Sequence, residues 1–197
     1  MATDDTKLEI LHDHYKDSFA HVREYIAVRD RLLFYILIVL TLILLQIFSP
    51  QDGGKKLSEF VTSKLGLASQ ISTAFIVSMI WFGLLALLIK YFQTVTCIEG
   101  QYEYIHRLED ELSKQYKGEI FTREGKTYLK NYPTFSKWTH IIYRLIFPAL
   151  LVMIVLIKIV GEWQQPGNNG WLLIVDSIMV GSILITVYLY LKTIFRK

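Results

Sequence analysis

Asp176 lies well inside an apolar stretch of this 197-residue chain and, with Lys158 on the adjoining stretch, is the first candidate for chemistry. Asp176 follows Trp171 by five residues in a run rich in Leu, Ile and Val, and Lys158 lies near the end of the preceding apolar stretch. A charge in the middle of a bilayer costs about 2.5–3.5 kcal/mol on insertion scales, so it needs a partner or water. We therefore expect an intramembrane ion pair of Lys158 with Asp176, or a hydrogen-bonded acid. The alternative is that Asp176 lines a pore or senses a change of charge.

The chain lacks the motifs of the common catalytic and metal sites. It contains no His-Glu-x-x-His, no Gly-x-Ser-x-Gly, no Gly-rich phosphate loop and no pair of intramembrane acids of the aspartyl-protease kind. His14, Asp17 and His21 would share a helix face, but this spacing does not demand a metal, which needs converging ligands. The single cysteine, Cys97, excludes an internal disulfide and a multi-cysteine zinc site. We expect no enzyme activity, no cofactor and no bound metal.

Four apolar stretches must position these residues. They cover residues 32–48, 71–92, 139–160 and 171–191 and are 17 to 22 residues long, against about 20 needed to cross about 30 Å of hydrocarbon. The chain is 52% hydrophobic, and its net charge of +3 is mixed along the sequence rather than clustered. We predict an all-α, polytopic membrane protein with four transmembrane helices, in contact with the lipid bilayer and with no direct nucleic-acid ligand.

The distribution of basic residues predicts the orientation. If the N-terminus is cytoplasmic, fifteen Lys and Arg residues lie inside and three lie outside, as the positive-inside rule requires. Both termini are therefore expected in the cytoplasm. The first outer loop contains a short amphipathic segment, residues 55–67, suited to a helix on the membrane surface, and residues 162–170 are expected to form a tight outer connection.

Apolar residues at three- and four-residue steps extend two of the spans. One stripe precedes the first span, and the other follows the second span as far as Lys117. Each pattern predicts an amphipathic helix continuous with its span. We expect a cytoplasmic helical stalk in which the two stripes are buried against each other or against a neighbouring subunit. The stripes are Leu8, Leu11, Tyr15, Phe19, Val22 and Ile26, and Val95, Ile98, Tyr102, Ile105, Leu108 and Leu112.

Charged residues occupy the rest of these two helices, which is typical either of a solvated face or of a surface that docks a cytosolic protein. On the second helix the docking candidates are Glu103, Arg107, Glu109, Asp110, Glu111 and Lys114.

Residues 119–138 are short, basic and aromatic. They suit a segment that lies on an anionic inner leaflet, or an elbow under the stalk. The candidate contacts with lipid headgroups are Arg123, Lys126, Lys130, Lys137 and Trp138.

The layout of residues 5–117, a long charged helix, a membrane hairpin and a long returning helix, resembles the small bacterial SLATT-type effectors. The second hairpin departs from the two-span pattern of those effectors. With four spans, the chain also resembles the membrane subunit of a two-gene anti-phage system such as Kiwa. The resemblance implies a homo-oligomer of the bacterial inner membrane that senses or disrupts the membrane during infection.

We divide the chain into a cytoplasmic amphipathic helix (1–31), a transmembrane hairpin (32–92), a cytoplasmic helix with the interfacial segment (93–138), a second hairpin (139–191) and a cytoplasmic tail (192–197). The expected function is a non-enzymatic sensor or effector of anti-phage defence that couples the membrane to a cytosolic partner protein through its stalk. The alternative is a small ion channel or transporter with Asp176 in its pathway.

Overall fold

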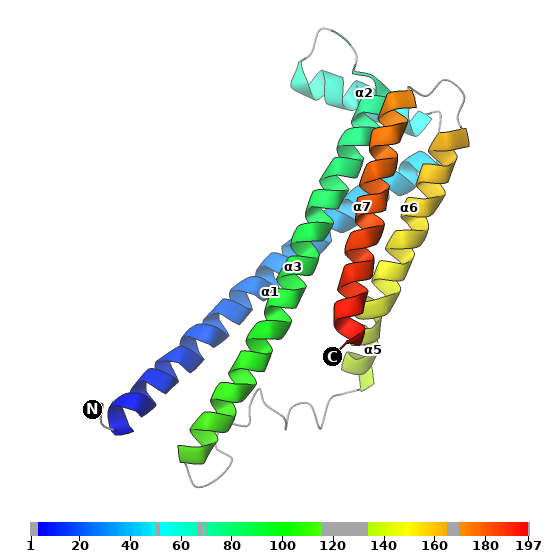
Figure 1. Cartoon of the computed structure of the whole chain (residues 1–197). Helices are drawn as coiled ribbons and strands as arrows, with labels where there is room; N and C mark the ends of the chain where they lie inside the picture. The colour runs from blue at the N-terminus through cyan, green and yellow to red at the C-terminus, as the bar shows by residue number, and fades with distance from the viewer. Residues whose placement is uncertain are drawn as a thin grey trace. The chain divides into compact units, whose positions relative to one another are not determined.

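The computed structural model describes residues 4–49, 52–66, 69, 71–115, 134–164 and 170–196, and all regular secondary structure in this part of the chain is helical (Figure 1). Four segments, Leu8–Phe48, Thr73–Lys114, Ile142–Gln164 and Gly170–Phe195, are long and apolar enough to cross a membrane. The predicted fold class, all-α with four membrane spans, is confirmed. The helices are α1 (Asp4–Phe48), α2 (Asp52–Leu65), α3 (Thr73–Gln115), α5 (Thr134–Ile141), the π-helix η1 (Ile142–Ile146), α6 (Phe147–Gln164) and α7 (Gly170–Phe195).

The chain divides into two compact units. We call Met1–Arg31 with Phe92–Ile141 the charged unit, and Leu32–Tyr91 with Ile142–Lys197 the spanning unit. The boundaries fall where α1 and α3 change between charged and apolar sequence. Both helices pass through that change without a break, because neither contains a proline or a glycine at the boundary.

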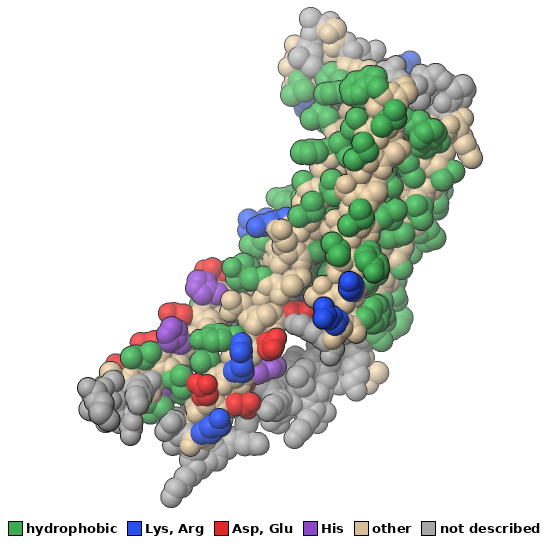
Figure 2. Space-filling model, in the orientation of Figure 1, with side chains coloured by type: hydrophobic (Ala, Val, Ile, Leu, Met, Phe, Trp, Pro, Cys, Tyr) green, Lys and Arg blue, Asp and Glu red, His purple; other side chains and the backbone are tan. Residues whose placement is uncertain are grey.

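The spanning unit has a buried apolar face on each of its long helices. The buried residues recur at three- and four-residue steps, as in Ile36, Leu40 and Ile43 of α1. The opposite faces expose large apolar side chains, which is the arrangement of helices in lipid rather than in water (Figure 2). Side chains that are nearly half exposed or more include Phe34, Leu37, Leu45, Met79, Phe82, Ile157, Ile174, Ile178 and Ile185.

Helix α6 begins with a local widening that its sequence explains. Pro148 has no N–H to donate to the Arg144 carbonyl, and its ring would collide with that oxygen in a regular α-helix. The preceding turn is the π-helix Ile142–Ile146, whose longer hydrogen-bonding step removes the collision. Arg144 then donates from Nη2 to the carbonyl oxygen of Ile194 at 3.0 Å, in the last turn of α7. A guanidinium at this position satisfies a carbonyl that the end of a helix leaves free.

Replacement of Arg144 by Met should loosen the last turn of α7. Loss of a half-buried charged hydrogen bond costs about 1 kcal/mol, equivalent to about fivefold faster amide exchange. Hydrogen exchange of residues 190–195 in detergent micelles measures the change. Arg196→Met, at an exposed position, is the control. Equal exchange in the two variants would contradict the role of Arg144 in capping the C-terminal end of α7.

The charged unit pairs the N-terminal part of α1 with the C-terminal part of α3. The Tyr15 hydroxyl donates to Glu109 Oε1 at 3.3 Å, and the Tyr25 and Cys97 side chains lie close to each other. The later position on α1, Tyr25, meets the earlier position on α3, Cys97, so the two helices are antiparallel. Five residues of the predicted stripes are buried in this pair, one on α1 and four on α3, and the other seven are half-buried. The buried five, at 6% exposure or less, are Val22, Ile98, Ile105, Leu108 and Leu112.

Tyr15→Phe should destabilise this helix pair by about 1–2 kcal/mol, because a buried acceptor loses a donor. Glu109 is only 4% exposed, so bulk water cannot replace the hydroxyl. Tyr104→Phe, at a 36% exposed position, should have almost no effect. Hydrogen exchange of residues 98–112 in both variants is the test, and identical protection would argue against the contact.

Helix α2 confirms the helix expected after the first span, and it is tied to the ends of its neighbours. The Ser58 hydroxyl donates to the Ile71 carbonyl oxygen, and the Ile71 amide donates to Thr62 Oγ1 at 3.2 Å. A Cβ at Gly53 would lie 3.1 Å from the Leu45 carbonyl oxygen, so α2 approaches α1 closely enough that a larger residue would force a shift of a few tenths of an ångström. Its location on a membrane surface stays a prediction.

Candidate functional site

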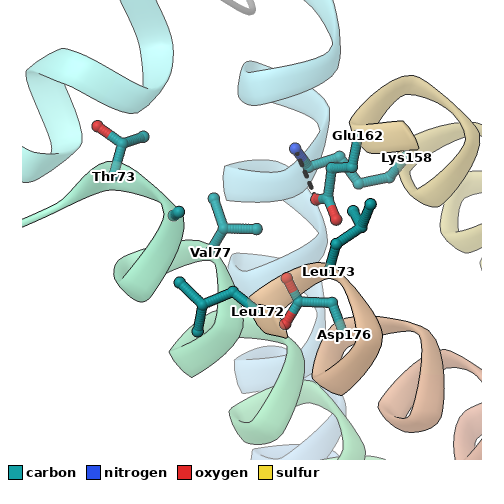
Figure 3. Close-up of a pocket in the computed structure, with 8 residues that line it drawn as sticks. Thr73, Val77, Lys158, Glu162, Leu172, Leu173 and Asp176 are labelled. Carbon is teal, nitrogen blue, oxygen red and sulfur yellow. Dashed lines mark ion pairs between the residues drawn. The ribbon is translucent and has the colours of Figure 1, made fainter. Parts of the chain in front are cut away.

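A buried ion pair lies near the C-terminal end of α6. Lys158 and Glu162 are one helical turn apart and therefore share a face. Lys158 Nζ lies 3.0 Å from Glu162 Oε1, and the side chains are only 10% and 4% exposed (Figure 3). Burial of both charges requires that each meets a partner, because the surrounding helices are apolar.

Trp81 of α3 supplies the second partner of Glu162. Its indole Nε1–H points at the carboxylate, and Nε1 lies 3.3 Å from each of the two oxygens. Trp81 is 1% exposed, so its ring also fills the core between these helices. The Glu162 carboxylate thus receives an ammonium from α6 and an indole donor from α3.

Asp176 of α7 completes the cluster from a third helix. The residue is 4% exposed, and the Ser78 side chain lies beside its carboxyl group. Its Oδ1 atom has no hydrogen-bond partner among the described residues. A buried polar atom of this kind requires an explanation, since most such atoms in folded proteins are paired.

Asp176 also lines a small cavity of about 50 Å³. Asp176, Lys158 and Glu162 line it from α7 and α6, and Figure 3 shows them converging from the two helices. The volume exceeds the roughly 10–15 Å³ that one water molecule requires. The rest of the lining comes from Thr73, Ala74, Val77, Leu172 and Leu173.

The cluster holds two carboxylates and one ammonium, so with all three ionised it carries one uncompensated negative charge. Coulomb interactions are stronger in an apolar interior than in water, and an unpaired charge there is correspondingly costly. The arrangement can therefore hold a positively charged group or ordered water beside Asp176. No group of three or more His, Cys, Asp or Glu side chains that could hold a metal was found in the described part of the chain.

The structure brings the two predicted intramembrane residues to one cavity but adds a residue that the sequence analysis missed. The ammonium of Lys158 is paired with Glu162 rather than with Asp176. Residue 162 was expected in the outer loop, and this expectation was wrong, because α6 continues to Gln164. The spacing offered a signal, a glutamate four residues after a lysine, although Gly161 between them also suggests a helix end.

The docking candidates on α3 separate into two sets. Glu109 was wrongly placed with the exposed charges: it follows Ile105 by four residues and precedes Leu112 by three, so it lies on the buried face. There it accepts the hydrogen bond from Tyr15. The remaining five candidates are exposed along α3, namely Glu103, Arg107, Asp110, Glu111 and Lys114.

The predicted headgroup contacts lie mostly outside the described residues. This applies to Arg123, Lys126 and Lys130, and to the side chain of Lys137. Trp138 is described, in helix α5, and its side chain is 53% exposed. Its contact with lipid stays a prediction.

The fold and the buried cluster together define an all-α polytopic membrane protein with ionisable groups enclosed among its spans. Comparisons with protein-family models, with curated proteins and with solved structures find no match to this chain. Its function must therefore be argued from its own residues and geometry.

Proposed function

We propose that this protein is a non-enzymatic membrane sensor or effector that couples the bilayer to a cytosolic partner protein. The observation that carries the proposal is the length of α1 and α3, 45 and 43 residues. At 1.5 Å per residue each is about 65 Å long, roughly twice the hydrocarbon thickness of a bilayer. An unbroken helix transmits a tilt or rotation of its membrane-embedded half to its charged half.

The exposed face of α3 is the proposed docking surface. Acidic and basic side chains alternate along it, with Glu103, Arg107 and Asp110 in successive turns. Mixed charges of this kind favour a selective partner of complementary pattern, and they contribute more to specificity than to affinity.

The proposed setting is the bacterial inner membrane, with both termini in the cytoplasm. The excess of Lys and Arg in the segments assigned to the cytoplasm supports this orientation. The layout resembles anti-phage membrane effectors, and we therefore propose a role in anti-phage defence as a homo-oligomer. In that role, a change in the membrane during infection alters the spans, and the charged helices pass the change to the partner.

Charge reversal on α3 tests the docking surface. The protein is purified in mild detergent from cells that contain its native neighbours, and co-purifying proteins are quantified. The double variant Asp110→Lys, Glu111→Lys should lose a cytosolic partner by at least about tenfold, as removal of interfacial charge pairs does. Glu24→Lys, an exposed reversal on α1, should retain it. Equal recovery from all three proteins would refute the assignment of the surface.

A small ion channel or transporter is the second candidate, and the cavity with Lys158, Glu162 and Asp176 favours it. Ionisable groups inside spans frequently mark ion pathways. Flux measured in reconstituted vesicles distinguishes the two functions: flux that disappears in Asp176→Asn supports a pathway, and absence of flux with partner binding intact supports the sensor.

A further inference from the structure

We propose that the C-terminal end of α7 binds the phosphate group of an anionic phospholipid through the side chains of Lys192 and Arg196. Both residues are exposed, and they lie one helical turn apart at the end of this helix. The proposal concerns a contact with lipid at one end of the spanning unit. It depends neither on a cytosolic partner nor on the side of the membrane at which this end lies.

The two cations continue the exposed apolar stripe of α7. Its members follow one another at steps of three, four or seven residues, and Lys192 and Arg196 come at the next two steps of four. The Arg196 amide donates to the Lys192 carbonyl oxygen at 3.2 Å, so the helical turn extends to Arg196. The two cations therefore face the surroundings of the stripe, which is lipid, and not the core of the unit. The stripe consists of Ile174, Ile178, Ile185 and Tyr188, which are 58% to 64% exposed.

No acidic side chain neutralises these two cations within the described part of the chain. Neither Lys192 nor Arg196 forms an ion pair with a described residue. The nearest acidic residue earlier in α7 is Asp176, sixteen residues before Lys192 and so about 24 Å away along the helix. An anionic headgroup carries the complementary charge, and it lies at the depth where an apolar stripe in lipid ends.

Neighbouring side chains suit this end of α7 to the boundary between lipid and water. Tyr188 and Phe195 flank Lys192 on the exposed face and are 62% and 71% exposed. Aromatic rings at helix ends are typical of the headgroup region. The hydrogen bond from Arg144 to the Ile194 carbonyl oxygen holds the last turn of α7 against η1. The backbone that carries the two cations is therefore fixed before lipid binds.

Native mass spectrometry of the purified full-length protein, titrated with phosphatidylglycerol or with phosphatidylcholine in a neutral detergent, tests the site. Each cation near an anionic headgroup should strengthen binding about fivefold, so the first phosphatidylglycerol should bind about twentyfold more tightly than phosphatidylcholine. The double variant Lys192→Gln, Arg196→Gln should lose this preference. The double variant Lys55→Gln, Lys56→Gln removes the same charge from exposed positions on α2 and should keep it.

The charge-preserving exchange Lys192→Arg, Arg196→Lys should retain the preference, because both cations stay in place. If the double glutamine variant does not fold, Lys192→Gln and Arg196→Gln alone should each lower the preference about fivefold. An unchanged preference in the glutamine variants would overturn the proposal, and so would an equal loss in the α2 variant, which indicates net charge alone. Displacement of the lipid by an equal concentration of inorganic phosphate would also overturn it, because the site would then take a soluble anion.

Discussion

Replacement of Lys158 by Met is expected to lower the free energy of unfolding of the spanning unit by about 3–5 kcal/mol, the range typical of breaking a buried ion pair. Methionine keeps most of the volume of the side chain but leaves the Glu162 and Asp176 carboxylates without an ammonium in an apolar surround. The loss of stability arises from the uncompensated negative charge and not from a lost contact. Removal of one of the two carboxylates should therefore restore stability.

The double variant Lys158→Met, Glu162→Gln supplies this control, because it restores the balance of charge while the amide oxygen introduced at position 162 can still accept from Trp81. We expect it to recover at least half of the lost stability. Unfolding by denaturant in mixed micelles, followed by tryptophan fluorescence, measures both variants. A double variant that is less stable than Lys158→Met would show that the pair acts through packing, and the electrostatic account of the cluster would fail.

Replacement of Ile105 by Ala is expected to destabilise the charged unit by about 2–4 kcal/mol, since it leaves a cavity in a fully buried position. Ile105 lies in the middle of the α3 stripe, between the two contacts that join α3 to α1. Isolated helices are marginal in water, so the helical state of this unit depends on such packing.

Ile10→Ala is the matched control, because the same side chain on α1 is 52% exposed. It should change stability by less than about 0.5 kcal/mol, as surface substitutions do. Amide exchange over residues 8–30 and 95–112 reports the opening of the pair. Similar protection in the two alanine variants would mean that the stripes are not packed against each other within one chain.

The long helices of this protein were predictable because each has a periodic or continuous apolar pattern. The four spans follow from uninterrupted apolar sequence, and the continuity of α1 follows from the absence of proline and glycine between its charged and apolar halves. The π-helix before Pro148 was also accessible in principle, because the proline removes a specific hydrogen bond.

The candidate site was predictable only in part. Lys158 and Asp176 were identifiable because a charge in an apolar run is conspicuous. Glu162 was missed because polar residues near the end of a span do not show whether the helix has ended. Glu109 was misassigned because its charge favoured an exposed position. Its place between Ile105 and Leu112 puts it on the buried face instead. The contact of Trp81 with Glu162 joins residues 81 positions apart, which no local pattern predicts.

These features combine into one physical scheme. In the scheme we propose, apolar faces hold the spans in lipid, the buried cluster makes one end of the spanning unit sensitive to charge, and the long helices connect the spans to a charged surface. The scheme requires that the charged unit and the first loop lie on opposite sides of the membrane.

Cysteine accessibility tests that requirement most directly. In a Cys97→Ser background, which removes the only native thiol, single cysteines are introduced as Lys56→Cys in α2 and Glu111→Cys in α3, both at exposed positions. A membrane-impermeant maleimide applied to intact bacterial cells should label the first variant, and it should label the second only after the membrane is permeabilised. Labelling of both variants in intact cells, or of the second alone, would contradict the account.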